Sequence, residues 1–534
     1  MAVTSPDKTL AEEIRRRRTF AIISHPDAGK TTLTEKLLLY GGAIHLAGSV
    51  KARRAQRHAT SDWMEMEKQR GISVTSTVLQ FEYGGFRVNL LDTPGHQDFS
   101  EDTYRTLVAA DSAVMLLDNR KGVEEQTRKL FAVCRLRRTP VFTLVNKCDR
   151  PGADPLQLLD DVEAELGLAC APVTWPILER DRLVGVYDRL RSEVHVFRKG
   201  GDHGQTRVDE EVGGLHDAEM RELVGASAHD RLLEELELFN EAGAELDPDA
   251  IRQGSVSPTF FGSALTNFGI GPFLDTFMDM APSPVPRESS RGPVEPTDEG
   301  FSGFVFKIQA NLDPRHRDRI AFIRVCSGRF EPGLIVTNVR SGKPLRLTQP
   351  QQVFARERAG LDEAWPGDIV GLHDRGSLHI GDTLAVDEGL EFGGIPRFSP
   401  EHFARVTVPD PLRRKHLDTG LKQLSEEGAA QVFYGDDGGG TAPIVGAVGP
   451  LQFDVLVHRL DTEYDVTARL ERLPYVAARW VEGPEEEIRR VASGYDRRLV
   501  RDARDQPLIL FESRWALDRT VEKETDLTYH SVAP

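Results

Sequence analysis

Three apolar runs in the first third of the chain each lead into a short polar motif. The runs are residues 19–23, the stretch VNLL at 88–91, and VFTLV at 141–145. Short apolar runs bounded by polar residues are typical of buried strands. Residues 31–39 have helical spacing. The pattern predicts an α/β domain with a mostly parallel sheet, whose strands carry polar residues at their ends.

The pattern of polar and apolar positions changes twice further along the chain. Residues 280–300, rich in Pro, Ser and charge, predict a linker. After it, short β-branched runs divided by turn signals favour a closed β-barrel. From about Phe398 strands and amphipathic helices alternate, which indicates a mixed α/β domain. The expected domains are 1–284, with an insertion at about 165–258, then a β-barrel at 296–392 and a C-terminal α/β (α+β) domain at 396–534.

Two stretches allow more detailed expectations. Within the insertion, residues 174–188 (TWPILERDRLVGVYD) look strand-rich, and residues 228–242 (AHDRLLEELELFNEA) have helical spacing. Near the end of the chain, residues 482–503 (EGPEEEIRRVASGYDRRLVRDA) predict a charged helix. The apolar segment PLILFES follows it.

Composition narrows the class of protein. The 534 residues are 39% hydrophobic with a net charge of −17, which argues against a surface that coats nucleic acid but leaves a local basic face open. The four cysteines form no CxxC pair, which indicates reduced thiols. The N-terminus has no signal-peptide pattern, and no apolar stretch approaches the ~20 residues of a membrane span. We expect a soluble, cytoplasmic protein with no membrane partner.

The loop after the first predicted strand reads SHPDAGKT, residues 24–31. A loop that precedes a helix presents backbone N–H groups to an anion. Lys30 would reach the β- and γ-phosphates of a nucleotide, and the Thr31 hydroxyl would ligate Mg²⁺. The first position is Ser24 where the strict pattern has glycine. A helix that happens to begin with Gly-Lys-Thr therefore stays an alternative at this point.

The second motif is DTPGH, residues 92–96. Mg²⁺ prefers oxygen ligands and keeps several waters, so Asp92 would hold the metal through water. Gly95 lacks a Cβ, so its N–H can approach a γ-phosphate. His96 is placed to orient an attacking water. A plain turn and a structural loop histidine are the alternatives.

The third motif is NKCD, residues 146–149. Asp149 can accept hydrogen bonds from N1–H and the 2-amino group of guanine, whereas adenine would leave the carboxylate unpaired, at a high cost. Asn146 can connect the base with the phosphate loop, and the stem of Lys147 can cover the ring. The order of the three motifs indicates GTP rather than ATP.

Together the three motifs resemble the translational GTPases, the family of elongation factors Tu and G. Two further segments match it. In EKQRGISVTS (67–76), Ser73 takes the place of the family's Mg²⁺-binding Thr; in FFGSALTNFGI (260–270), a backbone N–H of Ser263, Ala264 or Leu265 would meet guanine O6. The resemblance implies catalysis by His96, Lys30 and Gly95, stimulated by the ribosome. It implies Mg²⁺ ligation by Thr31, Ser73 and Asp92. The implied GTP/GDP site comprises Ser24, His25, Pro26, Asp27, Ala28, Gly29, Lys30, Thr31, Thr32, Asp92, Thr93, Pro94, Gly95, His96, Asn146, Lys147, Asp149, Ser263, Ala264 and Leu265.

The region after the predicted barrel indicates the branch of the family. About 135 residues remain there, too few for the further domains of elongation factor G. Stretches outside the shared motifs, such as LSEEGAAQVF and VGPLQFDVLVHRL, resemble the bacterial release-factor branch. This resemblance implies a monomer that binds the ribosome and uses GTP to displace class I release factors for recycling, without reading stop codons.

Other functions remain open from the sequence. The nearest alternative is another ribosomal GTPase, translocase-like or a ribosome-protection factor. An alternative from a different class is a P-loop ATPase or kinase, against which the NKCD motif argues. A third class is a GTP-binding scaffold that does not hydrolyse its nucleotide.

Overall fold

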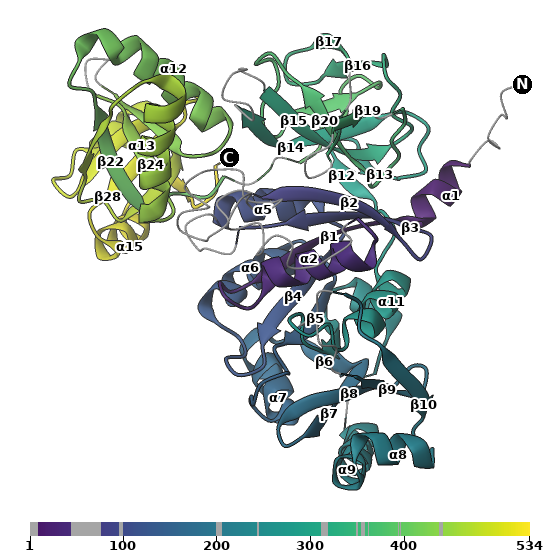
Figure 1. The fold of residues 1–534 in the computed structure, drawn as a ribbon. Coiled ribbons are helices and arrows are strands. Elements are labelled where there is room, and N and C mark those ends of the chain that lie inside the picture. Colours follow the sequence, from purple (N-terminus) through teal and green to yellow (C-terminus); the bar gives the residue numbers. More distant parts are fainter. Residues whose placement is uncertain are drawn as a thin grey trace, which may run out of the picture.

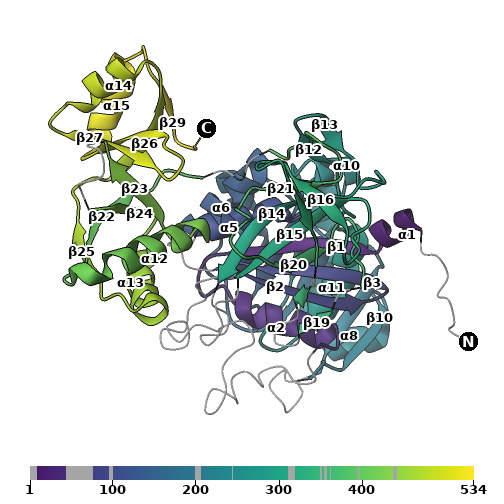
Figure 2. The same ribbon diagram turned by 90° about the horizontal axis from the view of Figure 1, so that it is seen from above.

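The structure, a computed structural model, has three parts that follow one another along the chain (Figure 1). It describes residues 9–43, 76–94, 100–198, 206–242, 245–310, 319–348, 351–353, 358–360, 362–393, 395, 397–436 and 442–533. Seen from above, the C-terminal part stands to one side of the other two (Figure 2). No helix within these ranges is long and apolar enough to cross a membrane.

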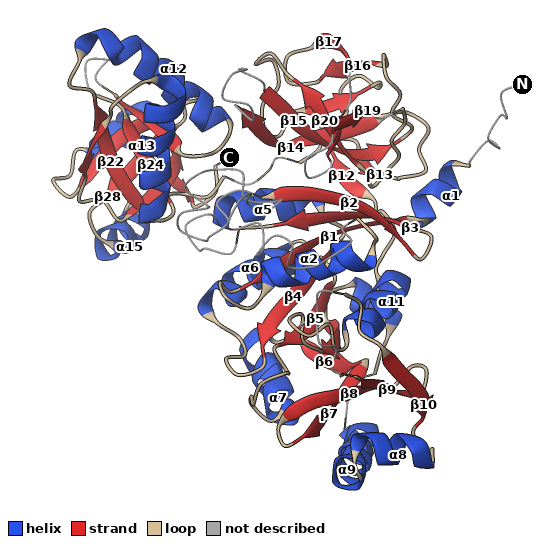
Figure 3. Ribbon diagram, viewed as in Figure 1, coloured by secondary structure: helices blue, strands red, loops and turns tan. Residues whose placement is uncertain are grey.

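The first part is built on a seven-stranded sheet with helices on both faces (Figure 3). Its strands are β1 (Arg17–Ser24), β2 (Thr77–Tyr83), β3 (Phe86–Asp92), β4 (Ser112–Asp118), β5 (Val141–Asn146), β6 (Ala169–Pro172) and β11 (Val256–Phe261). The order is β2-β3-β1-β4-β5-β11-β6, and every neighbouring pair is parallel except β2 with β3. The predicted mostly parallel sheet is confirmed. Because parallel strands share one direction, β1, β3, β4 and β5 end at the same edge.

The helices of this part explain why its strands are apolar on both faces. They are α1 (Leu10–Arg15), α2 (Lys30–Tyr40), α5 (Ser100–Ala109), α6 (Glu125–Leu136), α7 (Pro155–Leu166), α10 (Pro248–Arg252) and α11 (Ile270–Met280). Helices α2 and α11 pack on one face, and α5, α6 and α7 cover the other. Each residue of β1, β4 and β5 is therefore buried.

The predicted insertion forms a layer of its own at the far end of this part (Figure 1). It contains a four-stranded antiparallel sheet in the order β10-β9-β8-β7, with two helices against it. These elements are β7 (Thr174–Glu179), β8 (Arg182–Asp188), β9 (Glu193–Phe197), β10 (Glu210–Gly214), α8 (Ala218–Val224) and α9 (Ala226–Ala242). The strands and the helix expected within the insertion are both present.

The second part is an antiparallel, barrel-like sheet of eight strands around its own apolar core. The strands are β14 (Ser302–Ala310), β15 (Arg319–Ser327), β16 (Ile335–Asn338), β17 (Lys343–Arg346), β18 (Gln351–Val353), β19 (Arg358–Gly360), β20 (Ile369–His373) and β21 (Thr383–Ala385). This is the β-rich domain that the short, evenly spaced runs predict.

The C-terminal part is an α/β domain with one eight-stranded sheet, in the order β25-β22-β24-β23-β27-β28-β26-β29. The strands are β22 (His402–Thr407), β23 (Gln431–Gly435), β24 (Ile444–Ala447), β25 (Arg469–Arg472), β26 (Ala477–Glu482), β27 (Arg497–Asp502), β28 (Pro507–Phe511) and β29 (Thr528–His530). The helices are η3 (Pro411–Arg413), α12 (Arg414–Glu426), α13 (Pro450–Tyr464), α14 (Glu485–Ala492) and α15 (Arg514–Lys523). Helices α12 and α13 pack against one half of the sheet, and α14 and α15 against the other.

Two local expectations differ from the structure. The charged helix expected over 482–503 ends at Ala492, and its second half is strand β27. The reason is tertiary, because β27 is paired on both sides, with β23 and β28. The expected linker at 280–300 contains a hairpin, β12 (Arg287–Ser289) with β13 (Gly292–Val294). The predicted domain limits themselves stay a prediction.

Buried ion pairs hold the first two parts together. The carboxylate of Asp111, just before β4, accepts a hydrogen bond from Arg287 at 3.0 Å and from Arg324 of β15 at 2.5 Å. Asp368 of the barrel accepts one from Arg17 of β1 at 2.8 Å. Burial by itself would raise the pKa of Asp368, but Arg17 and Arg87 outweigh it and the pKa is lowered. The barrel-like part is thus fixed against the beginnings of β1 and β4, at the opposite ends of these strands from the predicted motifs.

Candidate nucleotide site

The loop between β1 and α2 has the backbone of an anion cradle. Gly29 immediately precedes α2 with φ of 101°, a left-handed conformation that favours glycine, and no side chain caps the helix. A Cβ at Gly29 would lie 2.4 Å from Nδ2 of Asn146, so only glycine fits there. The first N–H groups of α2 therefore remain for a phosphate. The Ser24 hydroxyl, at the end of β1, is buried and makes no protein hydrogen bond among the described residues.

Lys30 and Asp92 meet below this loop. The ammonium of Lys30, the first residue of α2, is 2.6 Å from Oδ1 of Asp92 at the end of β3, and it also donates to the carbonyl of Thr93. The Thr93 hydroxyl donates to the carbonyl of Ile22 at 2.6 Å, which ties the segment after β3 to β1. These two buried charges fit a phosphate with its Mg²⁺ at this point. The Lys30 ammonium would face the phosphate, and the Asp92 carboxylate would face the metal.

Asn146 connects three loops at this edge of the sheet: the phosphate loop, its own loop after β5, and the loop after β11. Its Nδ2 donates to the carbonyl of Ala28 in the phosphate loop at 2.8 Å, and its Oδ1 accepts from the N–H of Ala264 at 2.8 Å. The Ser263 hydroxyl donates to Oδ1 of Asp149 at 2.6 Å. The structure thus brings together residues from positions 28, 146–149 and 263–264, as the motifs predict. The Asp149 carboxylate is therefore fixed through Oδ1, whereas its Oδ2 faces the exposed guanidinium of Arg150 at 3.6 Å.

Lys147 lies across the gap between the phosphate loop and β4. Its backbone is left-handed (φ 68°), which is unusual for a residue other than glycine or asparagine. Its ammonium donates to the carbonyl of Asp27 and, at 2.8 Å, to Oδ2 of Asp118. Asp118 is not among the residues of the predicted motifs. The signal was present, since Asp118 ends an apolar run, SAVMLLD, as Asp92 and Asn146 end theirs.

The Asp118 carboxyl is held in its charged form. Burial alone would raise its pKa, but hydrogen bonds from Lys147 and from the N–H of Arg120 outweigh burial, and the pKa is lowered. Another contact missed from the sequence is that of His25, whose Nε2 lies 3.3 Å from Oε1 of Glu124. The phosphate loop is thus connected to Asp118 at the end of β4 through Lys147, and to Glu124 beyond β4 through His25.

Some of the predicted site residues are exposed, and three are not described. Ser73, Gly95 and His96 lie outside the described residues. Pro26, Thr32 and Pro94 are in place beside the loops, whereas Asp27 and Thr31 are exposed and Leu265 is 41% exposed. All four cysteines are free and buried, and burial raises the pKa of Cys148 to about 12. Within the described ranges no group of His, Cys, Asp and Glu forms a ready-made metal site.

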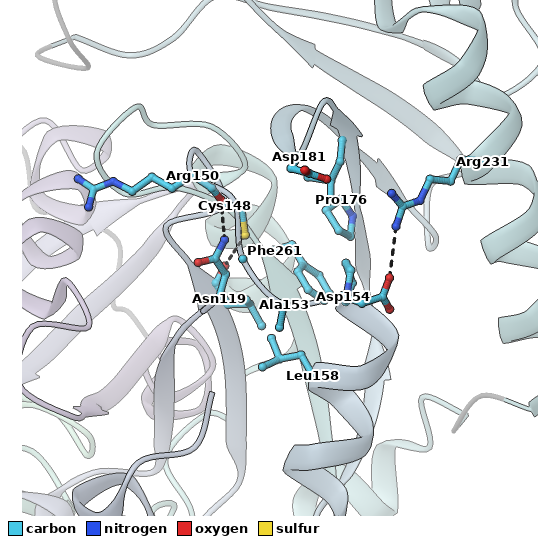
Figure 4. Close-up of a pocket in the computed structure, with 14 residues that line it drawn as sticks. Asn119, Cys148, Arg150, Ala153, Asp154, Leu158, Pro176, Asp181, Arg231 and Phe261 are labelled. Atoms are coloured by element: carbon cyan, nitrogen blue, oxygen red, sulfur yellow. Dashed lines mark hydrogen bonds and ion pairs between the residues drawn. The ribbon is translucent and has the colours of Figure 1, made fainter. Parts of the chain in front are cut away.

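A cavity of about 200 Å³ lies behind the predicted guanine loop (residues 146–149), between β5, α7 and the inserted sheet (Figure 4). Its lining includes Val145, Cys148, Leu158, Pro176 and Phe261. No residue of the phosphate loop lines it. The cavity is therefore separate from the nucleotide site, although it shares a wall with the loop that carries Asp149.

The comparisons with known proteins cover almost the whole chain. Residues 15–283 match the model of the elongation factor Tu GTP binding domain, 300–387 that of elongation factor G domain 2, and 392–521 that of the class II release factor RF3 C-terminal domain. Among curated proteins, peptide chain release factor 3 of Symbiobacterium thermophilum is 56% identical over 98% of this chain and 99% of its own. That of Acaryochloris marina is 54% identical over 98% and 97%.

A solved structure has the same fold. A crystal structure of a protein from Thermus thermophilus matches with a TM-score of 0.68 at 24% identity, over 88% of this chain and 71% of that one. At this identity the likeness concerns the fold alone. It extends over more than one of the three parts, since it covers 88% of this chain.

Proposed function

Because this chain belongs to the peptide chain release factor 3 family and is a translational GTPase, we propose that it promotes the dissociation and recycling of class I release factors from the ribosome. It acts after peptide release and does not read the stop codon. It works in the cytoplasm as a monomer. The class II release factor model over residues 392–521 supports this function over that of a translocase-like or ribosome-protection factor.

The nucleotide part of the proposal assigns one role to each loop. The N–H groups at the start of α2 and the Lys30 ammonium hold the phosphates of GTP or GDP. Thr31, Ser73 and, through water, Asp92 are the proposed ligands of Mg²⁺, which when bound neutralises charge on the phosphates. The contact of Lys30 with Asp92 at 2.6 Å supports a shared position for phosphate and metal ligands.

The guanine base is selected by the loop after β5. Asp149 accepts hydrogen bonds from N1–H and the 2-amino group, and Lys147 covers the ring with its stem. The Ala264 N–H is directed to Asn146, so we assign the contact with guanine O6 to the neighbouring N–H of Leu265. The remaining motif residues shape the walls of the site.

Hydrolysis requires a water and a place for negative charge. We propose that His96 orients the water, whose oxygen forms a bond to the γ-phosphorus while the bond from that phosphorus to the β,γ-bridging oxygen breaks. Lys30 and the Gly95 N–H stabilise the charge that spreads over the γ-phosphate oxygens. GDP and phosphate leave, and the segments that contacted the γ-phosphate lose that contact, which is the basis of a switch.

The observation that carries the proposal is that the two hydrogen bonds of Asn146 join three segments far apart in the sequence: the phosphate loop at Ala28, the NKCD motif and the loop at Ala264. The experiment is a termination assay on ribosomes that have released their peptide, with a fluorescent class I release factor. We expect this protein with GTP to raise the rate at which one class I molecule serves several ribosomes. Equal rates with GTP, with GDP and without the protein would contradict the proposal. Movement of tRNA and mRNA without factor release would instead favour a translocase.

A further inference from the structure

The end of strand β4 contacts the guanine loop on the side that faces the sheet. Asp118 and Asn146 are register partners, at the ends of β4 and β5. One oxygen of Asp118, Oδ1, accepts from the N–H of Arg120 at 2.9 Å and so caps the turn after β4. The other, Oδ2, accepts from the ammonium of Lys147 at 2.8 Å. A turn cap needs only one oxygen, so the second contact requires a separate explanation.

Lys147 is held at both ends of its side chain. Its left-handed backbone directs the side chain back over the site, and its ammonium is shared between Asp118 and the carbonyl of Asp27 in the phosphate loop. A long lysine side chain otherwise loses considerable rotamer freedom when it is placed over a base. The Asp118 carboxylate, with only 10% of its side chain exposed, supplies that placement in advance through a charge-assisted hydrogen bond.

The next residue, Asn119, holds the other side of the same loop (Figure 4). Its Nδ2 donates to the carbonyl of Arg150 at 2.9 Å, and its N–H donates to the carbonyl of Asn146 at 3.0 Å. The bonds of Asp118 and Asn119 therefore enclose the loop that carries Asp149. Asp118 at the end of β4 and Asn119 just beyond it hold the loop before and after the carboxylate that selects the base.

We propose that Asp118 is a positioning residue of the guanine site. By holding the ammonium of Lys147, it keeps the lysine stem over the base and connects the phosphate loop with the guanine loop. It touches no part of the nucleotide itself. This inference rests on the proposed nucleotide site. Its consequence is slow dissociation of GDP and GTP alike, with no effect on which base is chosen, because the selection is made by Asp149.

The test uses the full-length protein and nucleotides with a fluorescent ribose label. In Asp118→Asn the amide oxygen can still cap the turn, but the amide NH₂ faces the ammonium of Lys147. We expect the dissociation rates of labelled GDP and GTP to rise about tenfold, as the loss of about 1.4 kcal/mol would give. The preference for GTP over xanthosine triphosphate should remain unchanged. In a Lys147→Ala background, Asp118→Asn should change the rates less than about twofold.

Asp188 provides a matched control. It ends β8, accepts from the N–H of Leu190 at 2.9 Å, and pairs with Arg191 at 2.8 Å, but it lies in the inserted sheet. Asp188→Asn should leave the dissociation rates unchanged. Asp118→Ser, which keeps a capping hydroxyl, should reproduce the faster dissociation in a protein that remains folded at the assay temperature. Asp118→Glu, which restores the charge, should recover part of the slow rate.

Two results would overturn the inference. One is a wild-type dissociation rate in folded Asp118→Asn and Asp118→Ser. The other is a full additional effect of Asp118→Asn when Lys147 is already alanine, which would mean that Asp118 acts by another route. If the wild-type protein itself fails to bind guanine nucleotides, the proposed function fails instead, so the two failures are distinguishable.

Discussion

The guanidinium of Arg105 on α5 donates a hydrogen bond to the carbonyl of Gly428 in the C-terminal domain, at 3.1 Å. Gly428 has φ of 75°, and a Cβ on it would lie 1.7 Å from Nη1 of Arg105. Arg105 is also paired with Glu101 at 3.0 Å on the same helix. Helix α5 begins at Ser100, four residues after the DTPGH motif in the sequence, so the C-terminal domain contacts the first described helix that follows this motif.

We therefore predict that Gly428→Ala weakens this contact between domains. A methyl group at this position must displace the Arg105 guanidinium, and the left-handed backbone adds strain of about 1 kcal/mol. The measurement is small-angle scattering of the full-length protein, in which the radius of gyration should increase. The control is Gly376→Ala, which has a similar φ of 97° with nothing within 4 Å of its Cβ. An equal radius for both variants and the wild type would contradict the prediction.

The second prediction concerns Lys307, which reaches from β14 of the barrel into the first domain. Its ammonium contacts both oxygens of Ser76, with 3.0 Å to Oγ, and the Ser76 N–H donates to Oδ2 of Asp102 at 2.7 Å. Lys307→Met should lower the free energy of the first unfolding transition in urea by about 3 kcal/mol at pH 7, because the buried Asp102 carboxylate loses a charge partner. Lys343→Met, at an exposed position, should have no effect.

The same pair gives a pH dependence. Burial alone would raise the pKa of Asp102, but Lys307 and then Arg105 and Ser76 outweigh burial, and the folded-state pKa is lowered. A carboxyl with a lowered pKa contributes stability above its unfolded value of about 3.9, and loses that contribution as the pH falls through its folded value. The difference between wild type and Lys307→Met should thus be largest above about pH 4 and shrink below it. A constant difference from pH 7 to pH 3 would contradict this.

The third prediction tests the base contact. In Asp149→Asn the amide oxygen can still accept from the Ser263 hydroxyl, but the other position becomes a donor that suits the C2 carbonyl of xanthine. We expect the ratio of affinities for GTP and xanthosine triphosphate to shift by about a hundredfold toward xanthine. Competition binding with both nucleotides measures it. Asp181→Asn, in the exposed turn between β7 and β8, is the control. Retained preference for GTP would refute the assigned contact.

The fourth prediction tests His96. His96→Ala should reduce ribosome-stimulated GTP hydrolysis at least about a hundredfold, the size of effect typical for loss of a group that assists proton transfer or orients water. Affinity for GDP should stay the same, because the role assigned to His96 involves only the attacking water. Single-turnover hydrolysis on ribosomes measures the rate, with exposed His216→Ala as control. Unchanged turnover would favour a GTP-binding scaffold.

Much of this protein could be predicted from the order of its residues. The apolar runs before Asp92 and Asn146 form parallel strands, and the polar motifs lie together at their ends, since parallel strands must end on one edge. The barrel-like domain and the mixed C-terminal domain also agree with local patterns. Residues 497–502 did not follow their local pattern, because neighbours on both sides draw this charged segment into the sheet.

The sequence by itself determined which chemical groups this protein can present to a nucleotide, because the spacing of short motifs sets what a strand end or a helix start carries. Only the tertiary structure decided which groups support them. The partnerships of Asp118 with Lys147, Asp111 with Arg324, and Arg105 with Gly428 join residues 29 to 323 positions apart. Such pairs leave no periodic trace in a sequence, since polar groups in the interior find their partners through packing in three dimensions.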